Sequence, residues 1–166
     1  LPPGGCRHRC GLSGPGALRL VRPDLDVTLL DSTRKKTNFL KETIQALGLD
    51  GVKALHGRAE EIGRDALHRD HYDLALARAV SSLPVLAELC LPLVKKGGLF
   101  IAMKGEADES QEASKAIHSL KGEVEDRILY HLPGLDQARS LILIRKMAAT
   151  PGRFPRRMAQ IRKSPL

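Results

Sequence analysis

The sequence predicts one α/β domain in which helices cover a doubly wound parallel sheet whose C-terminal edge is antiparallel. After Pro23, short β-rich runs alternate with longer amphipathic runs, an order typical of right-handed β-α-β crossovers. Near the C-terminus, two strand-like runs follow each other without a helix between them, which favours an antiparallel hairpin. A chain of 166 residues can bury about 70% of its unfolded surface, enough for one such core.

The expected elements alternate in the order that this sheet requires. Runs of apolar and β-branched residues predict strands at residues 26–30, 52–55, 72–77, 99–103, 124–132 and 141–145. Periodic apolar residues predict helices at residues 33–47, 60–67, 83–93 and 108–120, with turns at residues 48 and 96–98. In the first of these helices, the expected buried stripe is Phe39, Leu40, Ile44 and Leu47.

The N-terminal segment, residues 1–17, does not fit this scheme. It holds three prolines and five glycines and shows no strand pattern, so the central first strand of the sheet is expected to be missing. Cys6, His8 and Cys10 alternate there without a fourth ligand, which does not match a zinc spacing, and no metal is expected. We therefore divide the chain into an aberrant segment (1–17), a central domain (18–149) and a basic tail (150–166).

Positive charge is concentrated at the two ends of the chain. The formal net charge is +8, yet all 19 acidic residues lie between residues 23 and 144. Outside that stretch, the basic residues at the start of the chain are Arg7, Arg9, Arg19 and Arg22, and those at the end are Arg145, Lys146, Arg153, Arg156, Arg157, Arg162 and Lys163. A basic tail on a near-neutral body suits a phosphate backbone, because each cation near a phosphate releases counterions. The alternative is a solvated, disordered tail.

Composition and cysteine content point to a cytoplasmic protein, which we expect to be a monomer. No run of about 18 apolar residues offers a membrane span, the first residues lack the pattern of a signal peptide, and three scattered cysteines make no disulfide framework. Cys90 lies in an apolar helix and is expected in the core. The run from His68 to His71 lies in a polar connection and is expected to face solvent.

Polar residues end three successive strands of the predicted sheet. Asp31 ends the first clear strand, where a carboxylate can accept hydrogen bonds from the ribose of an adenosine cofactor, or can cap the next helix instead. The stretch HGRAEE, residues 56–61, follows the next strand. Arg78 ends the third, either aimed into the same crevice or as a surface residue. Three such ends at one edge of the sheet favour a common site.

At these residues the sequence resembles the bacterial glucose-inhibited division protein B family, methyltransferases that act on N7 of guanosine in small-subunit (16S) ribosomal RNA. The resemblance runs from about Ala17 to Leu166. It is carried by VRPDLDVTLLDSTRKKTNFL, HGRAEE, YDLALARAVSSLPVL, CLPLVKKGGLFIAMKG and FPRRMAQIRKSPL.

The resemblance implies a Rossmann-like methyltransferase fold that binds S-adenosylmethionine through Asp31, Ala59, Glu60 and Arg78. It implies that Lys104 and Gly105 lie near the reaction centre and the bound RNA. The tail residues that it places near RNA are Arg156, Arg157, Arg162 and Lys163. No catalytic acid or base is expected, because N7 of guanine has a free lone pair and no proton to lose.

The family also carries a glycine-rich cofactor loop of the form D-x-G-x-G-x-G-x-P-G, which residues 5–17 replace. Codons for these residues, read one base later, permit D-A-G-T-G-A-G-F-P-G-L-A, so we expect a frameshift just before Leu18 in a gene truncated at its 5′ end. A non-catalytic fragment with residual RNA binding is therefore the alternative to an active enzyme. A methyltransferase for a small molecule or a protein is the third possibility.

Overall fold

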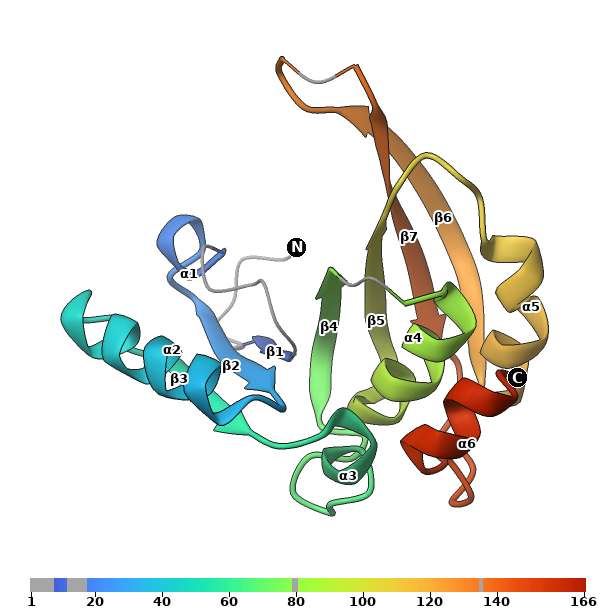
Figure 1. Cartoon of the computed structure of the whole chain (residues 1–166), viewed down its shortest axis with the longest axis horizontal. Helices are drawn as coiled ribbons and strands as arrows, with labels where there is room; N and C mark the ends of the chain where they lie inside the picture. The colour runs from blue at the N-terminus through green and yellow to red at the C-terminus, as the bar shows by residue number, and fades with distance from the viewer. Residues whose placement is uncertain (1–7, 12–17, 79–80, 135) are drawn as a thin grey trace.

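A computed structural model describes residues 8–11, 18–78, 81–134 and 136–166. The described strands form one seven-stranded sheet in the order β3-β2-β1-β4-β5-β7-β6 (Figure 1). These strands are β1 (His8–Gly11), β2 (Leu25–Asp31), β3 (Val52–His56), β4 (Tyr72–Arg78), β5 (Val94–Lys104), β6 (Gly122–His131) and β7 (Ala138–Lys146). The helices are α1 (Leu18–Val21), α2 (Arg34–Ala46), α3 (Ala59–Ile62), α4 (Leu83–Cys90), α5 (Ser110–Ser119) and α6 (Met158–Lys163), with a 3-10 turn η2 (Leu91–Leu93).

The sheet confirms the predicted fold class. Strands β1 to β5 pair in parallel, whereas β7 runs antiparallel to both β5 and β6. The chain builds outward from β1 in two directions, with β2 and β3 on one side and β4 and β5 on the other. This reversal of strand order beside β1 is the place where open α/β sheets bind their ligands.

The expectation that the first strand is missing is wrong. Strand β1 lies between β2 and β4, with His8 paired to Leu25 in register and Gly11 to Ala75. A ladder is made by backbone N–H and C=O groups, so a short segment without apolar alternation can still fill a central position. The other residues of the 1–17 segment lie outside the described part of the chain.

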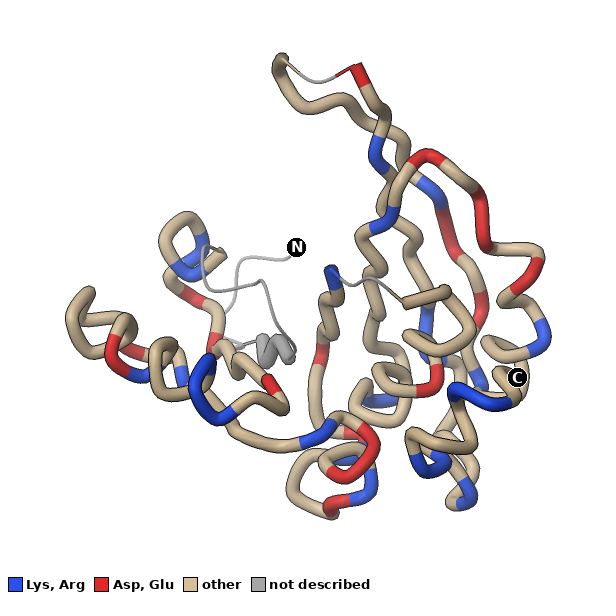
Figure 2. The backbone as a smooth tube through the Cα atoms, viewed as in Figure 1, with Lys and Arg blue, Asp and Glu red and all other residues tan. Residues whose placement is uncertain are grey.

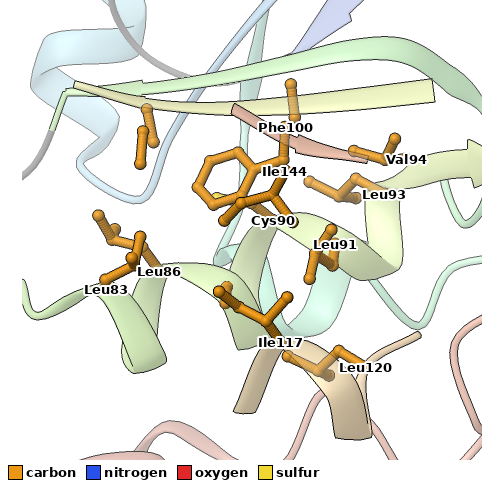
Figure 3. Packing of buried hydrophobic residues seen from close by; sticks show 14 of the residues in the cluster. Leu83, Leu86, Cys90, Leu91, Leu93, Val94, Phe100, Ile117, Leu120 and Ile144 are labelled. Atoms are coloured by element: carbon orange, nitrogen blue, oxygen red, sulfur yellow. The ribbon is translucent and has the colours of Figure 1, made fainter. Parts of the chain in front are cut away.

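The main core lies between the sheet and the two helices α4 and α5. Figure 3 shows Phe100 and Ile144 of the sheet lying against Cys90 of α4, with Ile117 of α5 beyond them. Cys90 is buried, as predicted, and burial raises the pKa of its thiol. This packing fixes α4 and α5 against β5 and β7, which carry one half of the candidate site.

Helix α2 packs on a second, smaller core beside β2 and β3, and its buried stripe is narrower than predicted. Leu40 and Ile44 pack against that core. Phe39 and Leu47, however, are 65% and 61% exposed. Residue 39 is one step off the stripe that contains the buried Thr37, and Leu47 lies beyond the last helical residue.

Two element boundaries also differ from the prediction. The turn expected at residues 96–98 lies inside β5, where a register shift opposite Tyr72 and Leu74 accommodates Gly97 at φ 78°. The helix expected at residues 60–67 ends at Ile62.

Both strands of the β6–β7 hairpin extend past the ends of β4 and β5 (Figure 1). In the described ranges, no helix has the length and apolar character to cross a membrane.

Candidate functional site

The candidate site lies at the carboxyl ends of the parallel strands, on both sides of β1. Gly11, the last residue of β1, pairs in register with Thr28 of β2 and Ala75 of β4. Both neighbours run three residues further, to Asp31 and Arg78. The sheet therefore brings two of the predicted site residues to one edge, flanking its central strand.

Asp31 has one oxygen engaged locally and one that is nearly uncommitted. Its Oδ1 accepts a hydrogen bond from the backbone N–H of Thr33 at 2.7 Å. Among the described residues, its Oδ2 has only a 4.0 Å contact with Nζ of Lys36, an exposed side chain. A carboxylate offers about four lone-pair positions, so shaping the turn before α2 leaves capacity for a ligand hydroxyl. The capping alternative is wrong, because the N-cap of α2 is Thr33 and Asp31 shapes the turn before it; a ribose contact by Asp31 stays a prediction.

Ala59 and Glu60 open α3, just past the end of β3. The backbone N–H of Gly57 donates to the carbonyl of Asp31 at 3.1 Å, which keeps this loop beside the end of β2. Glu60 is 8% exposed, and its Oε1 lies 3.8 Å from Nη1 of Arg58. An acidic residue in the first turn also favours the helix dipole, so Glu60 has a structural role whether or not it contacts a ligand.

On the other side of β1, a cavity of about 790 Å³ opens between the ends of β4 and β5 and the β6–β7 hairpin. It is lined by Arg78, Met103, Lys104, Gly105, Glu106, Ala107, Glu109, Tyr130, Leu132 and Arg139. The volume falls within the roughly 300–1,000 Å³ typical of small-molecule sites. Three predicted residues, Arg78, Lys104 and Gly105, therefore share one cavity.

Lys104 is tied to the protein rather than free in this cavity. Its Nζ donates to the carbonyl of Ser81 at 2.7 Å and lies 2.7 Å from Oε1 of Glu109. The second oxygen of Glu109 accepts the backbone N–H of Leu83, the first residue of α4, at 2.6 Å. Lys104 and Glu109 thus connect the end of β5 to the start of α4.

The basic tail is clamped to the domain. Nη2 of Arg69 donates to the carbonyl of Thr150 at 2.7 Å, and its Nη1 to that of Phe154 at 2.9 Å. Arg64 Nε donates to the carbonyl of Pro155 at 2.8 Å. Because two arginine side chains donate to several of its carbonyl groups, the backbone of the segment before α6 is held in one conformation.

Glu88 binds the same C-terminal segment through Arg156. This glutamate of α4 is fully buried and accepts two hydrogen bonds from the guanidinium of Arg156, at 2.8 and 2.6 Å. The carboxylate raises the pKa of Arg156 through those hydrogen bonds. Of the predicted RNA-contacting tail residues, Arg156 therefore has an internal partner. The others, Arg157, Arg162 and Lys163, are exposed and unpaired within the described residues. Figure 2 shows the basic positions of this C-terminal segment along the backbone.

The run from His68 to His71 is half-buried and bonded to the domain rather than freely exposed to solvent, so that prediction is wrong. Nδ1 of His68 lies 2.7 Å from the hydroxyl of the buried Tyr72, and Arg69 holds the tail. Asp70 contacts the fully buried Lys146 at 3.2 Å. These partners of Arg69 and Asp70 lie 76 to 85 residues away, so the polar run itself offers no sequence signal for these contacts.

Glu106, Tyr130 and Arg139 line the cavity but are not predicted from the sequence. The hairpin itself was predicted, but nothing in its sequence shows that it lines a cavity together with the ends of β4 and β5. Glu88 did carry a signal, since a charged residue inside an apolar helix needs a buried partner.

The sheet order and the acidic end of β2 define a Rossmann-like domain of the methyltransferase class. Solved structures agree in fold. A 1,6-didemethyltoxoflavin-N1-methyltransferase from Burkholderia thailandensis, bound to S-adenosylhomocysteine, matches with a TM-score of 0.62 and 14% identity over 86% of this chain and 72% of that one. M. jannaschii TYW2 in complex with AdoMet matches with a TM-score of 0.63 and 13% identity, over 87% and 72%.

Within that class, the model of the rRNA small subunit methyltransferase G family matches residues 12–141, and the chain belongs to this family. Curated relatives named ribosomal RNA small subunit methyltransferase G are similar along most of the chain. The one from Acetivibrio thermocellus is 48% identical over 158 residues, and the one from Lactobacillus delbrueckii is 44% identical over 151. These alignments cover 94% and 90% of this chain but 65% and 63% of the relatives.

Proposed function

We propose that this chain transfers a methyl group from S-adenosylmethionine to N7 of a guanosine in small-subunit ribosomal RNA. The observation that carries the proposal is the pairing of two features at one edge of the sheet. A carboxylate with a nearly uncommitted oxygen ends β2, and a cavity of about 790 Å³ opens at the ends of β4 and β5. Donor and acceptor could thus bind on opposite sides of β1. Family membership supports this assignment.

The residues at the ends of β2 and β3 suit the adenosine half of the cofactor. Asp31 Oδ2 would accept hydrogen bonds from the ribose hydroxyls, as acidic residues at this strand end do in nucleotide-binding sheets. Ala59 and Glu60 would border the adenine through the start of α3. Arg78 would mark the boundary between cofactor and acceptor. When bound, S-adenosylmethionine supplies an electrophilic methyl group, and the protein needs only to hold it.

The reaction requires the methyl donor and N7 to be aligned, but it requires no proton transfer. N7 of guanine presents a lone pair without a proton, so the chain needs no general base at the acceptor. Holding two reactants in line can supply roughly 7–11 kcal/mol of the barrier in well-oriented cases. The Lys104–Glu109 pair would serve this purpose, because it fixes the end of β5 against the start of α4 and so sets the shape of the cavity.

RNA would approach across the C-terminal segment. Arg157, Arg162 and Lys163 are exposed around α6 and available for phosphates, whereas Arg156 keeps the segment in place through Glu88. Because the base must reach a recessed cavity, the target nucleotide has to leave its stack. We infer a soluble monomer in the cytoplasm, consistent with a ribosomal RNA substrate.

The test is transfer of a tritiated methyl group from S-adenosylmethionine to small-subunit RNA, followed by nucleoside analysis. We expect labelled 7-methylguanosine, its loss in Asp31→Ala, and its retention in Asp50→Ala, which removes an exposed carboxylate outside the site. Label in a different nucleoside would refute the assignment. RNA binding without any transfer would favour the alternative of a non-catalytic fragment.

A further inference from the structure

The loop after β5 is pinned at several points while one of its carboxylates stays free. Ser140 of β7 donates to the carbonyl of Gly105 at 2.7 Å, and Arg127 of β6 donates to the carbonyl of Glu106. Arg127 also lies 3.7 Å from a carboxylate oxygen of Asp108. Glu106 is an exposed residue that lines the cavity, and its carboxylate has no partner among the described residues. Hydrogen bonds therefore hold the backbone of Glu106 in place, and its carboxylate is available to bind a ligand.

The facing wall of the cavity comes from the β6–β7 hairpin. Tyr130 and Arg139 are direct neighbours across the two strands, and both line the cavity. The guanidinium of Arg139 has no partner within the described ranges. An aromatic ring beside an unpaired cation is suited to a nucleotide, because the ring can stack on a base while the cation binds a phosphate.

We propose that this cavity selects guanosine through Glu106, which accepts hydrogen bonds from N1–H and the N2 amino group of the base. Tyr130 stacks on the purine, and Arg139 binds an adjacent phosphate. The inference rests on the proposed function for the identity of the methylated base. It assigns the choice of guanosine over adenosine to one carboxylate.

The chemistry of the two purines explains this choice. A carboxylate only accepts hydrogen bonds, and guanine offers two parallel donors at its Watson–Crick edge. Adenine presents the bare N1 acceptor there, which a carboxylate repels. Glu106 would thus both favour guanosine and disfavour adenosine.

The same arrangement leaves N7 free to react. Glu106 follows β5, which is one strand further from β1 than β4 is. A guanine held there by its Watson–Crick edge can turn its opposite edge, with N7, toward β4 and β1. That is the side on which Asp31 would hold the methyl donor.

The test compares binding of two fluorescein-labelled pentanucleotides, UUGUU and UUAUU, to the full chain by fluorescence anisotropy at low salt. A good bidentate contact discriminates by roughly 5- to 150-fold, so we expect the wild-type chain to prefer UUGUU at least about tenfold. In Glu106→Gln, the preference should fall to about twofold or less. Glu112→Gln is the matched control, because it removes the same charge from an exposed residue of α5 outside the cavity.

Three further variants test the other contacts. Tyr130→Ala should weaken binding of both oligonucleotides, while Tyr130→Phe should restore it because the ring remains. Arg139→Gln should weaken both equally and reduce the slope of log affinity against log salt by about 0.7.

The outcomes separate this inference from the proposed function. A wild-type chain that binds neither oligonucleotide or binds both alike overturns the inference, as does a preference that Glu106→Gln retains. If 7-methylguanosine forms in that case, the proposed function is supported and only the assignment of guanosine selection to this cavity is refuted. A guanosine preference that depends on Glu106, found without methyl transfer, would support the binding site and refute the proposed reaction.

Discussion

The pair between Glu88 and Arg156 makes the strongest prediction about stability. The carboxylate of Glu88 is fully buried and accepts two hydrogen bonds from the guanidinium of Arg156, together with one from the backbone N–H of residue 156 at 2.9 Å. Removing one partner of a buried ion pair typically costs about 3–5 kcal/mol, because the other charge stays buried without compensation. The backbone donor survives in Arg156→Ala, so we expect a loss of about 3 kcal/mol.

Urea unfolding followed by circular dichroism measures this loss. The matched control is Arg157→Ala, which removes an exposed neighbour without an internal partner and should change the free energy of unfolding by at most about 0.5 kcal/mol. Arg157→Ala should weaken RNA binding instead. Equal stability of the two variants would refute the assignment of Arg156 to the clamp rather than to RNA.

Three other predictions concern a buried lysine, a packed glycine and the tail. Burial lowers the pKa of Lys146 from 10.5 to about 8, so the unfolded chain binds more protons than the folded one between these values and stability should rise by about 3 kcal/mol across that window. In urea titrations from pH 7.5 to 10, Lys146→Met should lack this rise; parallel curves for variant and wild type would contradict it. Gly122→Ala would bring a Cβ within 3.0 Å of Ile144 and Leu91 side-chain atoms and should cost about 1–3 kcal/mol by the same assay, whereas Gly152→Ala, which meets no atom within 4 Å, should cost less than about 1 kcal/mol; equal losses would refute the packing. Replacing both Arg162 and Lys163 by Gln should lower the salt slope of single-stranded RNA binding by about 1.4, and an unchanged slope would exclude these residues from the RNA contact.

The parallel sheet with an antiparallel edge was predictable because it depends on local patterns. Alternating strand and helix signals require parallel crossovers, and the missing helix between β6 and β7 requires an antiparallel pair. Asp31 and Arg78 could be placed for the same reason, since the ends of parallel strands share one edge. Strand β1 escaped prediction because its four residues pair through the backbone and carry no apolar alternation.

The remaining features depend on contacts between distant parts of the chain. Glu88 and Arg156 are separated by 68 residues, and Arg69 reaches carbonyl groups 81 to 85 residues away. No local rule predicts which cation will find which carboxylate. For the same reason, the sequence shows only that the tail is basic. It does not show that Arg156 binds Glu88 whereas Arg157, Arg162 and Lys163 have no partner among the described residues.

Calorimetric titration with S-adenosylmethionine tests most directly whether the edge of the sheet beside β1 is a cofactor site. Loss of a hydrogen bond to a charged group costs about 1.5–3 kcal/mol, so Asp31→Ala should weaken binding by roughly 10- to 150-fold relative to the wild-type chain. Asp50→Ala should bind as the wild type does. Absence of binding by the wild-type chain, or equal affinity in all three proteins, would contradict the assignment of the cofactor to Asp31 and the ends of β2 and β3.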